Sequence, residues 1–99
     1  MKYKTIIQLE AVQDFEEAKL WYRRTKVNGL PQRFTSAVKT TITNLQKYPT
    51  AYAIRYENVR IAHTEKFPYA IHFFIDNDRI VIIAIIYSGR DPKITFDRV

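Results

Sequence analysis

Seven consecutive apolar residues near the end of the chain constrain the fold more than any other feature. Residues 80–86 read Ile-Val-Ile-Ile-Ala-Ile-Ile, whereas a strand with one wet face would alternate apolar and polar side chains. The unbroken run predicts a central strand that is covered by helices on one face and by other apolar side chains on the opposite face. This strand leads directly into Tyr87, Ser88, Gly89 and Arg90, so a tyrosine and an arginine lie where the chain leaves the core.

The remaining periodicity predicts an α+β fold. Residues 2–9 have the pattern of a first strand, and two segments with helical spacing follow, the second of which ends at Pro49. Asn28 and Gly29 suit a left-handed C-terminal cap between these helices, and the short connection predicts an antiparallel pair. Further strands are expected at 52–56, 59–65, 69–75 and 79–87, with a hairpin turn at 76–78. We therefore expect an N-terminal strand, an antiparallel helix hairpin and a three- to four-stranded antiparallel meander, with the helices packed on one face.

Length and composition indicate one domain that spans residues 1–99. The chain has no cysteine, which excludes disulfides, thiol catalysis and thiolate metal sites. Its start has no apolar run of signal-peptide length, and no stretch reaches the roughly 18 apolar residues that a membrane span requires. We therefore expect a cytoplasmic protein.

The positive charge of the chain is concentrated in one region. Sixteen Lys and Arg residues against ten Asp and Glu residues give a net charge of +6. The segment 18–56 contains no acid and these basic residues: Lys19, Arg23, Arg24, Lys26, Arg33, Lys39, Lys47 and Arg55. Such a field attracts nucleic acid, an acidic protein surface or an acidic peptide. The alternative is a solvated helix face that keeps a small protein soluble.

The side chains that could act on a ligand are mainly cationic and aromatic. They fall at or near predicted strand ends and comprise Arg60, Lys66, Arg79 and Arg90, with Tyr56, Tyr69 and Tyr87 close to them in sequence. Guanidinium groups can hold phosphate oxygens and rings can stack on bases. The same cations could stabilise the pentacovalent phosphate of a metal-free RNA cleavage. The alternative is that residues 90–92 simply form the turn that ends the last strand.

The histidines and the serine suggest no further chemistry. His63 and His72 fall in different predicted strands and, without cysteine, make no metal-ligand set. His72 is better interpreted as a hydrogen-bonded structural histidine. Ser88 has no evident histidine and acid in register, which argues against a hydrolase triad. We expect neither a metal nor another cofactor.

Four stretches, in order, resemble the RelE/ParE superfamily of bacterial type II toxins: DFEEAKLWY, RFTSAVKTTITNLQKYP, VRIAHTEKFPYAIHFFID and AIIYSGRDP. The likeness runs from about residue 10 to 96 and implies a helix hairpin on a small antiparallel sheet. It also implies a toxin of a plasmid-stabilising or stress-response system, neutralised by an antitoxin that wraps it with a flexible, often acidic segment. The antitoxin would bind the acid-free stretch, with Lys19, Arg23, Arg33 and Lys39 as candidate contacts. A homodimer or a hetero-oligomer with the antitoxin fits the same resemblance.

The resemblance implies one of two activities, mRNA cleavage on the ribosome or poisoning of DNA gyrase. Members of the RNA-cleaving branch generally have an arginine where Ala70 stands, an arginine matching Arg90, and often a tyrosine where Phe96 stands. Many members of the gyrase-poisoning branch have a histidine where Tyr87 stands.

One of the three ribonuclease positions is kept, so we expect a ParE-like protein that acts by binding rather than as an enzyme. Its expected target contacts are Arg60, Lys66, Tyr87 and Arg90. One alternative is a metal-independent ribonuclease that uses these four residues, and the other is a non-toxic member that binds only the antitoxin.

Overall fold

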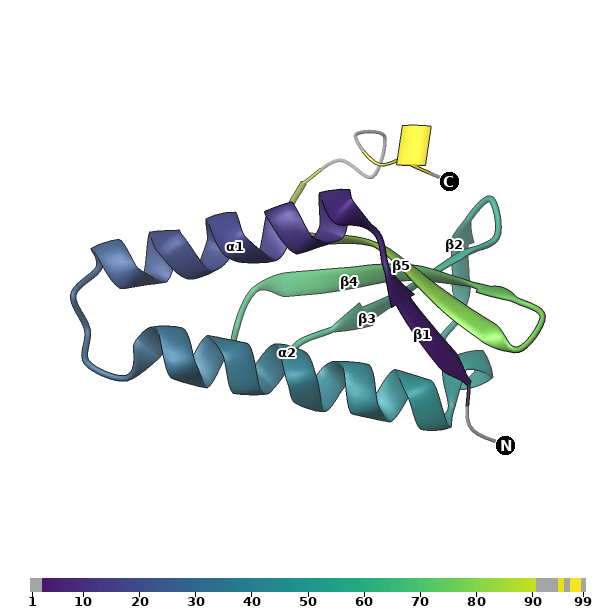
Figure 1. Ribbon diagram of the computed structural model, residues 1–99, viewed down its shortest axis with the longest axis horizontal. Helices are drawn as coiled ribbons and strands as arrows, with labels where there is room; N and C mark the ends of the chain where they lie inside the picture. The colour runs from purple at the N-terminus through teal and green to yellow at the C-terminus, as the bar shows by residue number, and fades with distance from the viewer. Residues whose placement is uncertain (1–2, 91–94, 96, 99) are drawn as a thin grey trace.

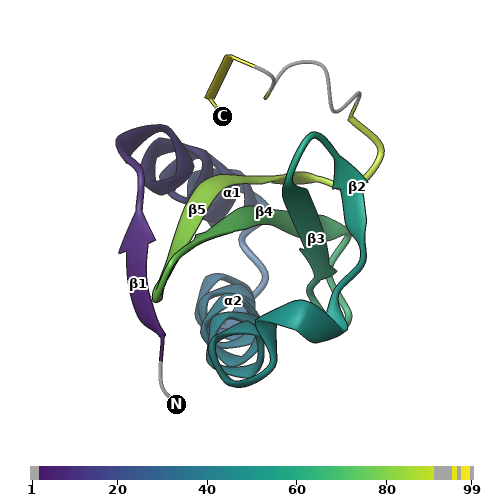
Figure 2. The same cartoon turned by 90° about the vertical axis from the view of Figure 1, so that its right-hand side faces the viewer.

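The computed structural model describes residues 3–90, 95, 97 and 98 of the 99-residue chain. Its elements follow the expected order: β1 (Lys4–Ile7), α1 (Leu9–Arg24), α2 (Leu30–Lys47), the short 3-10 helix η1 (Pro49–Ala51), β2 (Ile54–Tyr56), β3 (Val59–His63), β4 (Tyr69–Asp76) and β5 (Arg79–Tyr87). The two helices run side by side along the sheet (Figure 1), and the end-on view in Figure 2 shows α2 in the hollow of the curved sheet. The predicted α+β fold, with its helix hairpin and antiparallel meander, is confirmed.

The apolar run lies in a strand with a neighbour on each side. The strand order is β1-β5-β4-β3-β2, and every residue from Ile80 to Ile86 is at most 8% exposed. The central position predicted for this strand is therefore confirmed. The sequence pattern did not predict that β1 pairs with β5 in parallel, from Lys4 opposite Arg79 to Ile7 opposite Ile82. A parallel pair needs no local turn, so the spacing of residues carries no signal for it.

The two faces of β5 enter different apolar clusters. Ile80, Ile82 and Ile85 pack in the cluster that contains the buried residues of both helices, among them Tyr22, Phe34, Val38 and Leu45. The opposite cluster contains Val59, Val81, Ile83, Ala84 and Ile86, with Tyr56 and Phe74 packed against it. The helix-facing positions change from even to odd numbers because β5 contains a bulge: Phe73 pairs with Ile82, but the preceding His72 pairs with Ala84.

The boundaries differ from the predicted ones at two connections. The first strand covers four residues rather than 2–9, and Leu9 already begins α1. The left-handed residue after α1 is Lys26 (φ 59°), whereas Gly29 (φ 78°) immediately precedes α2. The predicted cap at Asn28 and Gly29 is therefore wrong as a cap of α1, although Gly29 does take the left-handed conformation that a glycine favours. Within the described part of the chain, neither helix is long and apolar enough to cross a bilayer.

Candidate functional site

Tyr87 and Arg90 line a groove between α1 and the ends of β4 and β5, which we call the aromatic groove. The groove has a volume of about 410 Å³ and is lined by Asp14, Glu17, Ala18, Trp21, Tyr22, Pro68, Tyr69, Ile85, Ile86, Tyr87 and Arg90. Trp21 and Tyr87 are 58% and 51% exposed, and Arg90 is exposed as well. The end of β5, with Tyr87 and Arg90, is therefore one wall of this groove.

The rings of the aromatic groove form a continuous series. Ring centroids are 5.2 Å apart for Trp21 and Tyr22, 6.0 Å for Tyr22 and Tyr69, and 6.2 Å for Tyr69 and Tyr87. Tyr69 and Tyr87 meet because they are direct cross-strand partners, and Tyr22 lies one helical turn after the buried Ala18. Burial raises the pKa values of the Tyr22 and Tyr69 hydroxyls. Both hydroxyls therefore stay protonated at neutral pH and can donate hydrogen bonds.

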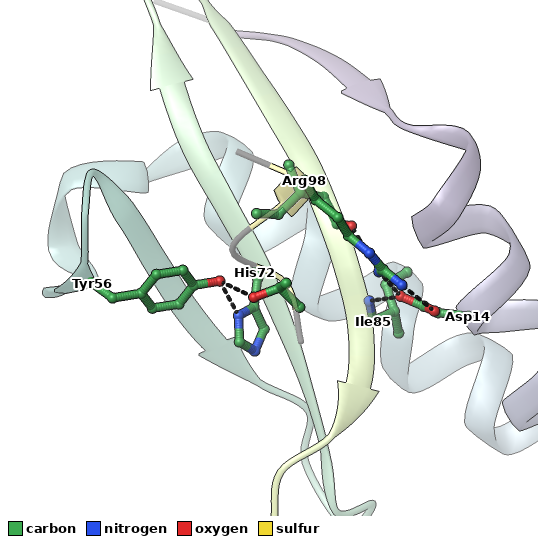
Figure 3. Close-up of polar contacts among 7 residues, drawn as sticks. Asp14, Tyr56, His72, Ile85 and Arg98 are labelled. Atoms are coloured by element: carbon green, nitrogen blue, oxygen red, sulfur yellow. Dashed lines mark hydrogen bonds and ion pairs between the residues drawn. The ribbon is translucent and has the colours of Figure 1, made fainter. Parts of the chain in front are cut away.

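Asp14 and Arg98 close the edge of β5 beside this groove (Figure 3). Strand β1 ends opposite Ile82, so the later residues of β5 have no strand on that side. The Ile85 amide donates to Asp14 Oδ2 at 3.1 Å. Arg98 Nη1 donates to the same oxygen at 2.6 Å and to the Ile83 carbonyl at 3.1 Å. A helix carboxylate and a C-terminal guanidinium thus replace the missing strand.

Sequence reasoning missed these two residues. A signal for Asp14 was present, because it lies three residues after Ala11 and four before Ala18, both of which are buried on the core side of α1. An acid on the apolar side of an amphipathic helix needs a buried partner. No comparable signal identified Arg98.

A second polar network, of Tyr56, His72 and Thr95, lies on the face of the sheet opposite to the helices (Figure 3). His72 is 3% exposed, and its Nδ1 lies 2.8 Å from the Tyr56 hydroxyl. That hydroxyl is 2.6 Å from Thr95 Oγ1. Burial lowers the pKa of His72 to about 4, and the charges of His63 and Arg98 act in the same direction against a smaller opposing effect of Asp14. The ring is therefore neutral at pH 7, and the expectation of a hydrogen-bonded structural histidine is confirmed.

The other candidate target contacts, Arg60 and Lys66, are not in the lining that holds Tyr87 and Arg90. Arg60 Nη1 donates to the Tyr52 carbonyl at 2.6 Å. Lys66 takes a left-handed conformation (φ 68°) in the turn between β3 and β4. It lines a second groove of about 770 Å³ together with Arg33 of α2. The four residues named from the sequence are thus divided among three places.

The candidate antitoxin contacts are only partly grouped. Lys19 and Arg23 line a third groove, of about 660 Å³, between the two helices, which we call the hairpin groove. Lys26 is in the same lining, which contains no carboxylate. Arg33 belongs to the second groove instead, and the exposed Lys39 lines none of these three grooves.

Ser88 and His63, which could belong to a hydrolase triad, lie side by side after β5 and at the end of β3. Of the histidine and acid that Ser88 was expected to lack, a histidine is present, because His63 Nδ1 lies 3.4 Å from Ser88 Oγ. The meander brings them together, since His63 pairs with Ala70 and Ala70 pairs with Ile86. No carboxylate is hydrogen-bonded to His63 among the residues that the structure describes.

Ala70 is 2% exposed and offers only a methyl group. Phe96, the other position at which the chain departs from the ribonuclease pattern, lies outside the described residues. The described ranges also contain no group of three or more His, Cys, Asp or Glu residues that could hold a metal ion.

Together, the fold and the site define a small basic α+β protein with several surface grooves and dispersed ionisable groups. The chain belongs to the family of ParE toxins of type II toxin–antitoxin systems, since the model for "ParE toxin of type II toxin-antitoxin system, parDE" matches residues 6–92. The expected resemblance to the RelE/ParE superfamily, on its ParE-like side, is confirmed.

The fold is also similar to a solved structure. A chain of the chromosomal ParDE TA system from P. aeruginosa superposes with a TM-score of 0.71. The two chains are 18% identical, and the match covers 87% of this chain and 96% of the other. No curated protein matches the sequence.

Proposed function

We propose that this chain, as one domain of residues 1–99, is the toxin of a type II toxin–antitoxin pair and acts by binding DNA gyrase. In this proposal a cognate antitoxin neutralises it, and Tyr87 and Arg90 contact the target. The ParE family match supports the toxin role. The observation that carries the choice of binding over catalysis is that Arg60 and Lys66 lie outside the lining that holds Tyr87 and Arg90.

Metal-free cleavage of RNA requires a cation and a proton-transfer group within hydrogen-bonding reach of one phosphate. Arg60 is bonded to the Tyr52 carbonyl, and Lys66 lines a different groove from Tyr87 and Arg90. At the position of Ala70 there is no charge or hydroxyl to take part. Only Tyr87 and Arg90 remain together, and they lie among rings that suit recognition of a partner.

The hairpin groove is the proposed antitoxin surface. Lys19, Arg23 and Lys26 give it three cations and no carboxylate. An acidic, flexible segment of an antitoxin would be attracted to this surface and would lose its disorder on binding. Arg33 and Lys39 lie on α2, outside the lining of this groove, and are proposed as peripheral contacts.

The test is induction of the chain in a bacterium, alone and together with the adjacent gene. We expect growth arrest with gyrase-linked DNA breaks when the chain is induced alone, and recovery when the neighbour is co-expressed. Mapping of mRNA 5′ ends in the same cultures separates the activities. Discrete new 5′ ends that vanish in Arg90→Ala would show that the chain acts as a ribonuclease and not by binding. Unaffected growth, with a stable complex between the two gene products, would instead indicate a member that only binds its antitoxin.

A further inference from the structure

We propose that the aromatic groove binds an extended peptide segment of a protein partner, in which a carboxylate lies next to an apolar or aromatic side chain. Arg90 pairs with the carboxylate, and the rings of Trp21 and Tyr87 receive the neighbouring side chain. The inference rests on the proposed function, because it specifies the chemistry of the partner that Tyr87 and Arg90 contact. Three features of the groove carry it.

The first feature is the state of the charged groups in the groove. Asp14 is bonded to Arg98, and their side chains are only 10% and 20% exposed. The Arg90 side chain, in contrast, makes no hydrogen bond or ion pair within the described residues, and it is exposed. Arg90 is thus the cation in the lining that is available to a ligand. A guanidinium in this state pairs well with a carboxylate, because both groups are planar.

The second feature is the set of tyrosine hydroxyls beside Arg90. Tyr22 and Tyr69 have no hydrogen-bond partner for their hydroxyls within the described residues, although every fully buried side-chain polar atom there has one. Both hydroxyls therefore reach the solvent of the groove that they line. Together with Tyr87 they provide three donors in the lining that also contains Arg90. The half-exposed rings of Trp21 and Tyr87 add apolar area for the adjacent side chain.

The third feature is the edge of β5. The Ser88 amide donates to the Pro68 carbonyl, on the side of β4, and the Ile85 amide points the other way, to Asp14. By alternation, the Tyr87 amide also faces away from β4, and Tyr87, unlike the buried Ile85, is 51% exposed. An extended peptide can accept a hydrogen bond from this amide, next to the side chains of Tyr87 and Arg90.

A peptide fits these features better than RNA does. The lining offers one available guanidinium, which matches one carboxylate, whereas a nucleic acid presents a row of phosphates. The exposed Glu17 lies in the same lining, and its carboxylate repels a polyanion.

The test uses Trp21, which is the only tryptophan of the chain and lies in the groove. Its fluorescence, excited where tyrosine does not absorb, is followed during titration of the purified chain with three short capped peptides. The peptides alternate valine and phenylalanine and differ at one position, which is glutamate, glutamine or lysine. We expect the glutamate peptide to bind about tenfold more tightly than the glutamine peptide, and the lysine peptide to bind more weakly than both.

Variants locate the binding. Arg90→Gln should weaken the glutamate peptide about tenfold and leave the glutamine peptide nearly unchanged, while Tyr69→Phe should cost about threefold. Arg24→Gln is the matched control, because Arg24 is an exposed cation of α1 outside the lining, and it should bind like the parent chain. Superimposable unfolding curves show that the variants are folded.

Equal binding of the glutamate and glutamine peptides, or an Arg90→Gln variant that binds as the parent does, would overturn the proposal. A short RNA oligonucleotide that binds the groove more tightly than the glutamate peptide would replace it with nucleic-acid recognition. Neither gyrase nor antitoxin is present in this assay. A chain that binds the peptide and does not arrest growth would therefore refute the proposed function alone.

Discussion

Replacing Asp14 with alanine should destabilise the protein more than any other removal of a single charge on α1. The carboxylate accepts the Ile85 amide at 3.1 Å and Arg98 at 2.6 Å. Its loss leaves the amide of a residue that is 3% exposed without a partner, which costs about 1–3 kcal/mol. Arg98 also loses its ion pair. Because that pair is 10% and 20% exposed, its loss adds about 1 kcal/mol rather than the cost of breaking a fully buried pair.

The sum of these two effects is about 2–4 kcal/mol, a large share of the roughly 5–15 kcal/mol of a domain of this size. At about 4–8 °C per kcal/mol the midpoint of thermal unfolding should fall by at least 8 °C. Urea unfolding, followed by Trp21 fluorescence and by far-ultraviolet circular dichroism, measures the free energy directly. Arg98→Ala keeps the bond from the Ile85 amide but removes the ion pair and the bond to the Ile83 carbonyl, so it should cost about 2 kcal/mol.

Glu16→Ala is the matched control for Asp14→Ala. Glu16 is an exposed acid two residues further along the same helix, and its removal should change the stability by no more than about 0.5 kcal/mol. The double variant Asp14→Ala/Arg98→Ala should lose less than the sum of the two single losses, since both single variants remove the same pair. If Asp14→Ala and Glu16→Ala unfold at the same urea concentration, the carboxylate does not hold the edge of β5.

Substitutions at three further positions test separate features. His72 has a folded pKa of about 4 against an ordinary value of 6.5. Between these values the unfolded chain binds more protons than the folded chain, so the free energy of unfolding should decrease as the pH is lowered. The loss should approach about 3 kcal/mol at pH 4 and be absent in His72→Gln; equal slopes in urea titrations of both proteins would contradict it. Gly89→Ala places a Cβ 2.8 Å from the Tyr87 ring, so peptide binding should weaken several-fold with little change in unfolding. Gly29→Ala at φ 78° should cost about 1 kcal/mol and Gly29→Asn less; equal unfolding midpoints would refute this strain.

The elements of the fold were predictable because each has a local pattern. The run 80–86 could only be a strand with both faces covered, and the helices and hairpins carried their own spacing and turn residues. The parallel pairing of β1 with β5 and the bulge at Ile83 were not predictable. Both depend on contacts between distant segments, and no turn residue or periodicity records them.

The candidate site was predictable in part for the same reason. Tyr87 and Arg90 are three residues apart, so the sequence placed them together. Arg60 and Lys66 looked equivalent to them as cations near strand ends. In the fold, however, Arg60 bonds to the Tyr52 carbonyl and Lys66 lines the second groove. Asp14 and Arg98 are joined across almost the whole chain, and only the folded structure shows the edge that they satisfy.

The proposed function is that this chain acts by binding DNA gyrase and not by cleaving RNA. Its most direct test is the supercoiling of relaxed plasmid by purified DNA gyrase in the presence of the purified chain, with a messenger RNA incubated in parallel. We predict that supercoiling is inhibited, that an excess of the cognate antitoxin restores it, and that the RNA stays intact. Undiminished supercoiling together with cleavage of the RNA would contradict the claim.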